Sequence, residues 1–176
     1  MTKKTELEAV ILAGGQSRRM GTDKAKLRLG RRTLLGHTKV LAKSLGLPAR
    51  VVARDLRPNA GPLGGIETAL ETTQAARVLF LSCDMPLLQP ALVQQILAVD
   101  APAVFASREG VVGFPFCLAA DLLPKVAAQL DAGERSLQKF SRAIRARRPR
   151  IAKANWPQLA NVNTPADLAR AAASLP

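Results

Sequence analysis

The sequence has little of what several protein classes require. Aromatic residues make up 3% of its 176 residues, tyrosine is absent, and the only cysteines are Cys83 and Cys117. Two cysteines cannot form a disulfide framework, and their spacing does not fit a zinc site. No apolar run approaches the length of about 20 residues that a membrane-spanning helix needs. We therefore expect a soluble protein with no membrane partner and two reduced, strand-end thiols.

The first residues also lack the apolar stretch of a signal peptide. Lys3 and Lys4 are mixed with Glu6 and Glu8 directly before the first predicted strand. A secretory signal would place an apolar segment and a cleavage site there. Together with the reduced thiols, this pattern predicts a cytoplasmic location.

The charge of the chain is strongly positive. Its 26 lysines and arginines exceed its 13 acidic residues, which gives a net charge of +13 and favours polyanionic partners. Single-stranded nucleic-acid binders stack bases on aromatic side chains, and these are scarce here. We therefore expect phosphate-rich small molecules and no nucleic acid. We interpret the densest basic run as a solvated helix end, with a phosphate contact as the alternative; it contains Arg142, Arg145, Arg147, Arg148 and Arg150.

Short apolar runs alternate with helical patterns along the chain, which predicts one α/β domain over residues 1–176. We expect buried strands at residues 9–13, 50–53, 78–82 and 103–106, an antiparallel strand at 114–118, and a last short strand at 150–152. We expect helices at residues 32–45, 63–73, 90–99, 119–130, 136–147 and 165–173. This order predicts a Rossmann-like three-layer sandwich whose sheet is mostly parallel, with an antiparallel strand late in the chain. His37, the only histidine, lies on a predicted helix away from every motif, so we expect it to be structural.

The loop at residues 12–24 follows the first predicted strand, at the sheet edge where α/β proteins bind ligands. Gly14 and Gly15 let the backbone approach a triphosphate, while Arg18, Arg19 and Lys24 add positive charge. The loop matches neither a P-loop nor a dinucleotide-binding fingerprint. A tight turn with surface charges would explain any one of these residues alone. The clustering of glycines and cations favours a phosphate-binding loop.

Three later segments also carry candidate site residues. Asp84 comes just after the predicted strand at 78–82, so its carboxylate offers the oxygen ligand that Mg²⁺ prefers; a turn-forming role is the alternative. Residues 61–65, Gly-Pro-Leu-Gly-Gly, precede a helix whose N-terminal amides can face a nucleotide. Asn161 and Asn163 have the period of two that places both amides on one side, although a capping role competes for Asn163.

These motifs, taken together, closely resemble the molybdenum cofactor guanylyltransferases. The matching segments are Leu-Ala-Gly-Gly at 12–15, Gly-Pro-Leu-Gly-Gly at 61–65, Cys-Asp-Met-Pro at 83–86 and Asn-Val-Asn-Thr-Pro at 161–165. Their order covers roughly residues 9 to 170, and residues 133–137 resemble the helical hairpin of the same family. A glycine-rich basic loop alone is common to many nucleotidyltransferases. The combination is similar to the guanylyl branch.

The resemblance implies that GTP and molybdenum-bearing molybdopterin react, with Mg²⁺, to give the guanine dinucleotide cofactor and pyrophosphate. It implies partners among molybdoenzyme maturation proteins as well. The implied nucleotide-binding residues are Leu12, Ala13, Gly14, Gly15, Lys24, Asp55, Gly65 and Asp84, with Asp84 also the metal ligand. The implied substrate-binding residues are Arg135, Asn161 and Asn163. Because nucleotidyl transfer depends on positioning and charge, we assign the catalytic roles to Arg19, Lys24 and Asp84.

One departure from the family pattern leaves alternatives open. Only residues 54–60 separate the second predicted strand from the Gly-Pro-Leu segment, where the family has a further helix and strand. The alignment of Asp55 and the selectivity for the base therefore stay open. The alternatives are a cytidylyl- or other nucleotidyltransferase acting on a phosphorylated small molecule, and a non-catalytic nucleic-acid-binding protein that exploits the positive charge.

Overall fold

Five strands form one twisted sheet in the order β4-β1-β5-β7-β6. The computed structural model describes residues 6–13 and 24–174. From edge to edge the strands are β4 (Ala49–Val52), β1 (Leu7–Leu12), β5 (Arg77–Ser82), β7 (Val111–Ala119) and β6 (Ala103–Arg108). β1 pairs in parallel with both β4 and β5, whereas β7 is antiparallel to β5 and β6. The mostly parallel sheet with a late antiparallel strand is confirmed.

The strands alternate their side chains between two apolar cores because successive residues of a strand point to opposite faces. In β5, Leu79 and Leu81 belong to one core, whereas Val78 and Phe80 belong to the other. All four are fully buried. The second core contains a stack of rings in which Phe116 lies 4.9 Å from Phe80 between ring centroids, and 4.6 Å from Phe105.

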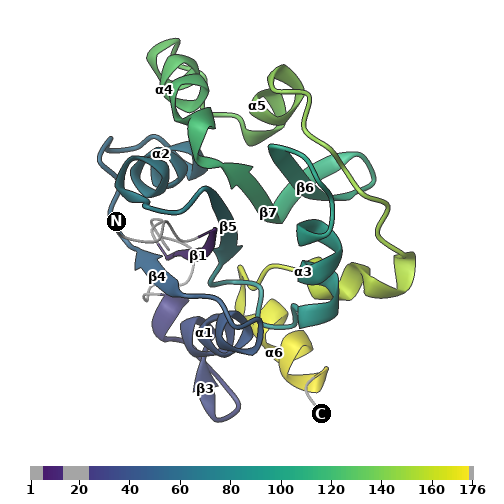
Figure 1. Ribbon diagram of the computed structural model, residues 1–176. Coiled ribbons are helices and arrows are strands. Elements are labelled where there is room, and N and C mark those ends of the chain that lie inside the picture. Colours follow the sequence, from purple (N-terminus) through teal and green to yellow (C-terminus); the bar gives the residue numbers. More distant parts are fainter. Residues whose placement is uncertain (1–5, 14–23, 175–176) are drawn as a thin grey trace.

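Helices cover both faces, and the sandwich has three layers as expected (Figure 1). One face carries α2 (Pro62–Thr72), α4 (Leu123–Asp131) and α5 (Leu137–Ala143). The other carries α1 (Leu34–Ser44) and α3 (Pro90–Leu97). None of the helices in the described residues is long and apolar enough to cross a membrane.

A small hairpin and the last helix form a third cluster beside α1. β2 (Arg28–Leu29) pairs antiparallel with β3 (Arg32–Thr33), and Leu29 and Leu34 pack with the face of α6 (Pro165–Ala173). The Nε2 atom of His37 lies 2.8 Å from the carbonyl oxygen of Leu29, so the histidine ties α1 to the hairpin. This contact agrees with the structural role expected for His37.

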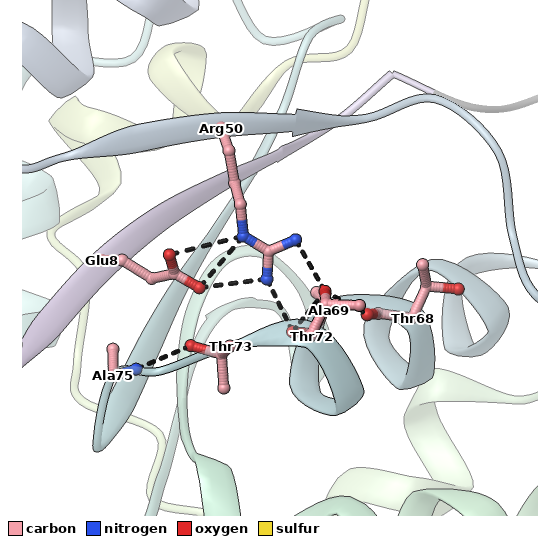
Figure 2. Close-up of polar contacts among 7 residues, drawn as sticks. All are labelled: Glu8, Arg50, Thr68, Ala69, Thr72, Thr73 and Ala75. Carbon is pink, nitrogen blue, oxygen red and sulfur yellow. Dashed lines mark hydrogen bonds and ion pairs between the residues drawn. The ribbon is translucent and has the colours of Figure 1, made fainter. Parts of the chain in front are cut away.

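Arg50 of the edge strand β4 joins β1 to the end of α2 (Figure 2). Its guanidinium donates to the Glu8 carboxylate of β1 at 3.0 Å, and to the carbonyl oxygen of Ala69 near the end of α2 at 2.6 Å. A third bond reaches the Thr72 hydroxyl at 2.9 Å. A cation at a helix C-terminus also interacts favourably with the helix dipole. The contacts fix the C-terminus of α2 at the amino ends of the strands, so its N-terminus faces their carboxyl ends.

Several predicted boundaries need correction. Residues 150–152 form no strand. The segment pairs with the sheet earlier in the chain, where Arg147 forms a bridge with Val104 of β6. The helix expected at 32–45 begins at Leu34, because residues 32–33 pair with β2. The helix expected at 136–147 ends at Ala143, and the one expected at 119–130 starts as the 3₁₀ turn η2 (Ala120–Leu122).

Both cysteines are buried thiols, but only one lies at a strand end. Cys83 follows β5 directly, whereas Cys117 lies within β7 and pairs with Leu79 of β5. Burial raises the pKa of the Cys117 thiol, which therefore stays protonated at neutral pH. The expectation of a strand-end position was wrong for Cys117.

Candidate functional site

The carboxyl ends of β4, β1 and β5 meet at one edge of the sheet and define the candidate site. Beyond β1, the Ala13 amide donates to the carbonyl oxygen of Val52 at 3.0 Å, and the Cys83 amide donates to the carbonyl oxygen of Leu12 at 3.4 Å. Leu12 and Ala13 are thus held between the two neighbouring strands. The loop that follows, with the predicted residues Gly14, Gly15 and Arg19, lies outside the described residues.

Asp84 lies at this edge, two residues after β5, as its place in the sequence predicts. The Ser82 hydroxyl donates to Oδ1 of Asp84 at 2.5 Å, which orients the half-buried carboxylate. The backbone carbonyl oxygen of Asp84 accepts a hydrogen bond from the Val162 amide at 2.8 Å. The turn after β5 is therefore joined to the segment that contains Asn161 and Asn163.

Lys24 and Asn163 meet although 139 positions separate them. The Nζ atom of Lys24, in the 3₁₀ turn η1 (Lys24–Lys26), donates to Oδ1 of Asn163 at 2.6 Å. The backbone amide of Asn163 in turn donates to the Asp167 carboxylate at 2.9 Å. Because the Asn163 segment is bonded to Asp84, these residues form one group, the Asp84–Lys24–Asn163 cluster.

The cap of α6 explains why Asn163 is free to face Lys24. Thr164 is the N-cap residue, and its hydroxyl accepts from the Asp167 amide while the Asp167 carboxylate accepts from the Thr164 amide. The Thr164 hydroxyl also donates to the Asp167 carboxylate at 2.8 Å, and this bond, with that from the Asn163 amide, holds the pKa of Asp167 below its ordinary value. The capping role that competed for Asn163 therefore belongs to Thr164, and the Asn163 side chain is available for the cluster.

Asp55 packs against the start of α2, so the short connection after β4 still brings it to the same edge. A Cβ atom added to Gly65 would lie 3.2 Å from the Leu12 side chain and 3.3 Å from Oδ1 of Asp55. The corresponding distance from Gly64 to Oδ2 of Asp55 is 3.1 Å. Burial raises the pKa of Asp55 above its ordinary value. The structure thus groups three of the predicted nucleotide-binding residues, Leu12, Asp55 and Gly65.

Arg57 fixes the loop that contains Asp55, and sequence reasoning missed it. Its Nε lies 2.8 Å from the buried carboxylate of Glu67 in α2, and its Nη1 lies 2.5 Å from the Asp131 carboxylate at the end of α4. The Leu56 amide also donates to the Thr68 hydroxyl at 2.9 Å. No sequence motif joins partners 10 and 74 positions apart, so only the fold could show this contact.

A hollow of about 270 Å³ lies beside the Asp84–Lys24–Asn163 cluster, and we call it the Asn161 hollow. It is lined by Met85 directly after Asp84, by Arg108 and Phe114 of the β6–β7 hairpin, and by Asn161. Asn161 therefore lines the hollow, whereas Asn163 belongs to the neighbouring cluster. Arg108 is a second residue that sequence reasoning missed, because a lone arginine at a strand end carries no motif.

Arg135 is not brought to the cluster by any hydrogen bond or ion pair among the described residues. It is exposed in the turn between α4 and α5. There, the Glu134 carboxylate accepts from the Ser136 amide at 3.0 Å and pairs with the Lys139 ammonium group at 2.5 Å. These contacts lower the pKa of Glu134 and order the turn.

The residues at the edge fit a magnesium ion that is held mainly by substrate oxygens. Within residues 6–13 and 24–174, no group of three histidine, cysteine or acidic side chains could enclose a metal. Mg²⁺ is usually bound by one or two carboxylates together with phosphates and water. The half-buried carboxylate of Asp84 has the chemistry of such a ligand.

A family model described as "MobA-like NTP transferase domain" matches residues 9–149. The chain belongs to this family. It is 30% identical to the molybdenum cofactor guanylyltransferase of Xanthomonas euvesicatoria pv. vesicatoria, over 97% of this chain and 96% of that relative. It is 33% identical to the enzyme of the same name from Shewanella sp. strain MR-4, over 97% of both chains. Membership in this NTP transferase family confirms the resemblance and makes the chain a nucleotidyltransferase.

Solved structures show that the MobA-like family and other nucleotidyltransferases share this fold. Molybdopterin-guanine dinucleotide biosynthesis protein A from Archaeoglobus fulgidus superposes with a TM-score of 0.73 and 17% identity, covering 94% of this chain and 97% of that one. The 2-C-methyl-D-erythritol 4-phosphate cytidylyltransferase of Thermus thermophilus gives a TM-score of 0.72 at 18% identity, covering 96% of this chain and 98% of that one. The fold alone therefore does not select the nucleotide.

Proposed function

We propose that this chain transfers GMP from GTP to molybdenum-bearing molybdopterin, in a reaction that requires Mg²⁺ and releases pyrophosphate. The observation that carries the proposal is the Asp84–Lys24–Asn163 cluster, which lies at the sheet edge where Leu12 and Ala13 lead into the glycine-rich loop. The guanylyltransferase names of relatives that match almost the whole chain support GTP over CTP.

The chain's own residues act by holding charge and geometry. In the proposed reaction an oxygen of the acceptor phosphate attacks the α-phosphorus of GTP, and the bond from that phosphorus to the bridging oxygen of pyrophosphate breaks. The Lys24 ammonium group, which Asn163 orients, would stabilise the negative charge on the phosphates. Since the attacking phosphate oxygen is already ionised, the reaction needs no general base.

Mg²⁺ would neutralise the phosphate oxygens and favour departure of pyrophosphate. Asp84 is the residue that would hold it, oriented by the Ser82 hydroxyl. The Asn161 hollow, which begins at Met85, is the part of the edge where the acceptor would bind, with Arg108 as a cation for its phosphate. The nucleotide would lie on the opposite side of Asp84, over Leu12 and the N-terminus of α2.

The variant Asp84→Asn tests this function. It keeps the size of the side chain and one oxygen but removes the charge that binds the metal. We expect a folded protein, with an unfolding midpoint in urea close to that of the wild type. Its transfer of labelled GMP should fall at least roughly 10-fold, since losing even an outer-shell partner of a metal costs about 10–100-fold. Asp100→Asn is the matched control, since Asp100 is exposed in the loop before β6. Full Mg²⁺-dependent activity in Asp84→Asn would refute the proposed site.

A further inference from the structure

A second cavity lies beyond the outer edge of β6, on the side away from β4. Its volume is about 550 Å³, within the range of about 300–1,000 Å³ that is typical of small-molecule sites. Ser107 and Glu109 at the end of β6 line one side, and residues 148–153 with Trp156 line the other. We call it the Trp156 pocket. Figure 1 shows the segment after α5 running alongside β6 toward the C-terminal helix.

Three cations line the Trp156 pocket, with one acidic residue among them. Arg148, Arg150 and Lys153 line it, and among the described residues none of them forms an ion pair. Other cations of the protein do have carboxylate partners; these include Arg50, Arg57, Lys139 and Arg170. The only acidic lining residue is Glu109. Cations gathered in a cavity create a positive potential that attracts anions.

The walls of the Trp156 pocket are held in place. The backbone of Arg147 exchanges two hydrogen bonds with β6, at 2.9 Å to the Phe105 amide and at 2.8 Å to the Ala103 carbonyl oxygen. The Arg148 guanidinium donates to the buried hydroxyl of Ser141 at 3.0 Å. Arg148 is thus held in place, and a donor that is already fixed loses little entropy when it binds a ligand.

Trp156 gives the pocket a flat apolar surface. Its indole N–H donates to the carbonyl oxygen of Ile151 at 3.3 Å, which orients the ring, and the Lys153 ammonium group lies 5.8 Å from the ring centroid. Trp156 is the only tryptophan in a chain with no tyrosine. An aromatic face next to guanidinium groups suits a planar ring that carries a phosphate.

The Trp156 pocket is separate from the nucleotide edge. It shares a single lining residue, Glu109, with the Asn161 hollow, and none with the Asp84–Lys24–Asn163 cluster. We propose that the Trp156 pocket is a second binding site, for a small phosphorylated heterocycle whose phosphate contacts Arg148 and Arg150 and whose ring stacks on Trp156. The basic run of the sequence, which includes Arg148 and Arg150, would then form part of a binding site as well as a solvated surface.

Intrinsic fluorescence tests this proposal directly, because all tryptophan emission comes from Trp156. The probe is GMP, titrated into the wild type, with guanosine and inorganic phosphate as its two separate halves. We expect a saturable change in emission with GMP, and an apparent affinity at least fivefold weaker for either half. No saturable change, or a response to phosphate alone that equals the response to GMP, would overturn the proposal.

Matched variants separate this pocket from general charge effects and from the nucleotide edge. Arg150→Gln should weaken GMP binding at least fivefold, whereas Arg142→Gln, an exposed arginine of α5 outside the pocket, should change it less than twofold. Equal losses in both variants would overturn the proposal. The fluorescence response should persist in Asp84→Asn, and its loss there would assign the signal to the nucleotide edge. Transfer activity does not enter these readouts, so the two proposals can fail separately.

Discussion

At the scale of single residues, the sequence selected several residues that the structure brings together, but it did not show their contacts. Asp84 and Lys24 could be selected because each is next to a predicted strand or a glycine-rich loop. The bond from Lys24 to Asn163 joins positions 139 apart, and no local pattern encodes such a pair. Arg57 and Arg108 were missed for the same reason, since their roles depend on helices and hairpins distant in the chain.

The Lys24 ammonium group is the first residue to test. Lys24→Ala removes a charge-assisted hydrogen bond to phosphate, a loss of about 1.5–3 kcal/mol, which corresponds to a roughly 10- to 150-fold lower kcat/KM. Lys39→Ala is the control, because Lys39 is exposed on α1 and its replacement also removes one positive charge. Steady-state pyrophosphate release measures both variants. Equal rates in the two would show that Lys24 is a surface charge.

Asp55 gives a pH-dependent prediction. Burial raises its pKa in the folded protein above the ordinary aspartate value of about 3.8. Its contribution to stability is therefore fully present below that value and is lost as the pH rises through the folded-state pKa. Asp55→Asn should unfold at the same urea concentration as the wild type near pH 4, and at a higher one near pH 7.

The control for this measurement is Asp100→Asn, which changes an exposed aspartate. Its difference from the wild type should not grow with pH. The stability gain in Asp55→Asn should come with weaker GTP binding, since Asp55 lies beside Leu12 and Gly65. If Asp55→Asn were more stable than the wild type at pH 4 but not at pH 7, the predicted direction of the pH dependence would be wrong.

At the scale of elements, buried strands and capped helices were the easiest to predict. β5 is a continuous apolar run and was found within one residue, and α6 has a proline at its first position and was found at both ends. The β2–β3 hairpin was missed because two-residue strands give no periodic signal. The segment after α5 was misassigned because its bond to β6 involves one residue, Arg147.

The start of α2 gives a prediction at this scale. A Cβ on Gly64 would lie 2.7 Å from the Ala60 Cβ, a distance that requires the backbone to move. Such overpacking costs about 1–3 kcal/mol, partly offset by the gain of about 1 kcal/mol for alanine in a helix. We expect Gly64→Ala to lower the free energy of unfolding by up to about 2 kcal/mol, the difference between these two effects, and to weaken GTP binding by displacing Asp55.

Gly113→Ala is the control for stability, because nothing lies within 4 Å of the position of its Cβ. Urea unfolding should place it within about 0.5 kcal/mol of the wild type. If Gly64→Ala were as stable as this control and bound GTP normally, then the close packing of α2 against Asp55 would have no role in the site.

At the scale of the whole molecule, the sequence predicted the layers, the mixed sheet and the edge at which the candidate site residues gather. It could do so because parallel strands place their carboxyl ends, and the residues that follow them, on one edge. The net charge of +13 suggested anionic ligands but not where they bind. The fold places Lys24 at that edge and Arg148, Arg150 and Lys153 at the Trp156 pocket, and a count of charges contains neither location.

The central claim is that the edge formed by Asp84, Lys24 and the start of α2 is a magnesium-dependent guanine nucleotide site. Titration calorimetry with GTP, ATP, CTP and UTP, each with and without Mg²⁺, tests it most directly. We predict that GTP in the presence of Mg²⁺ binds at least tenfold more tightly than the other three nucleotides, and that chelating the metal removes most of this affinity. Equal affinities for all four, or a preference for CTP, would contradict the claim.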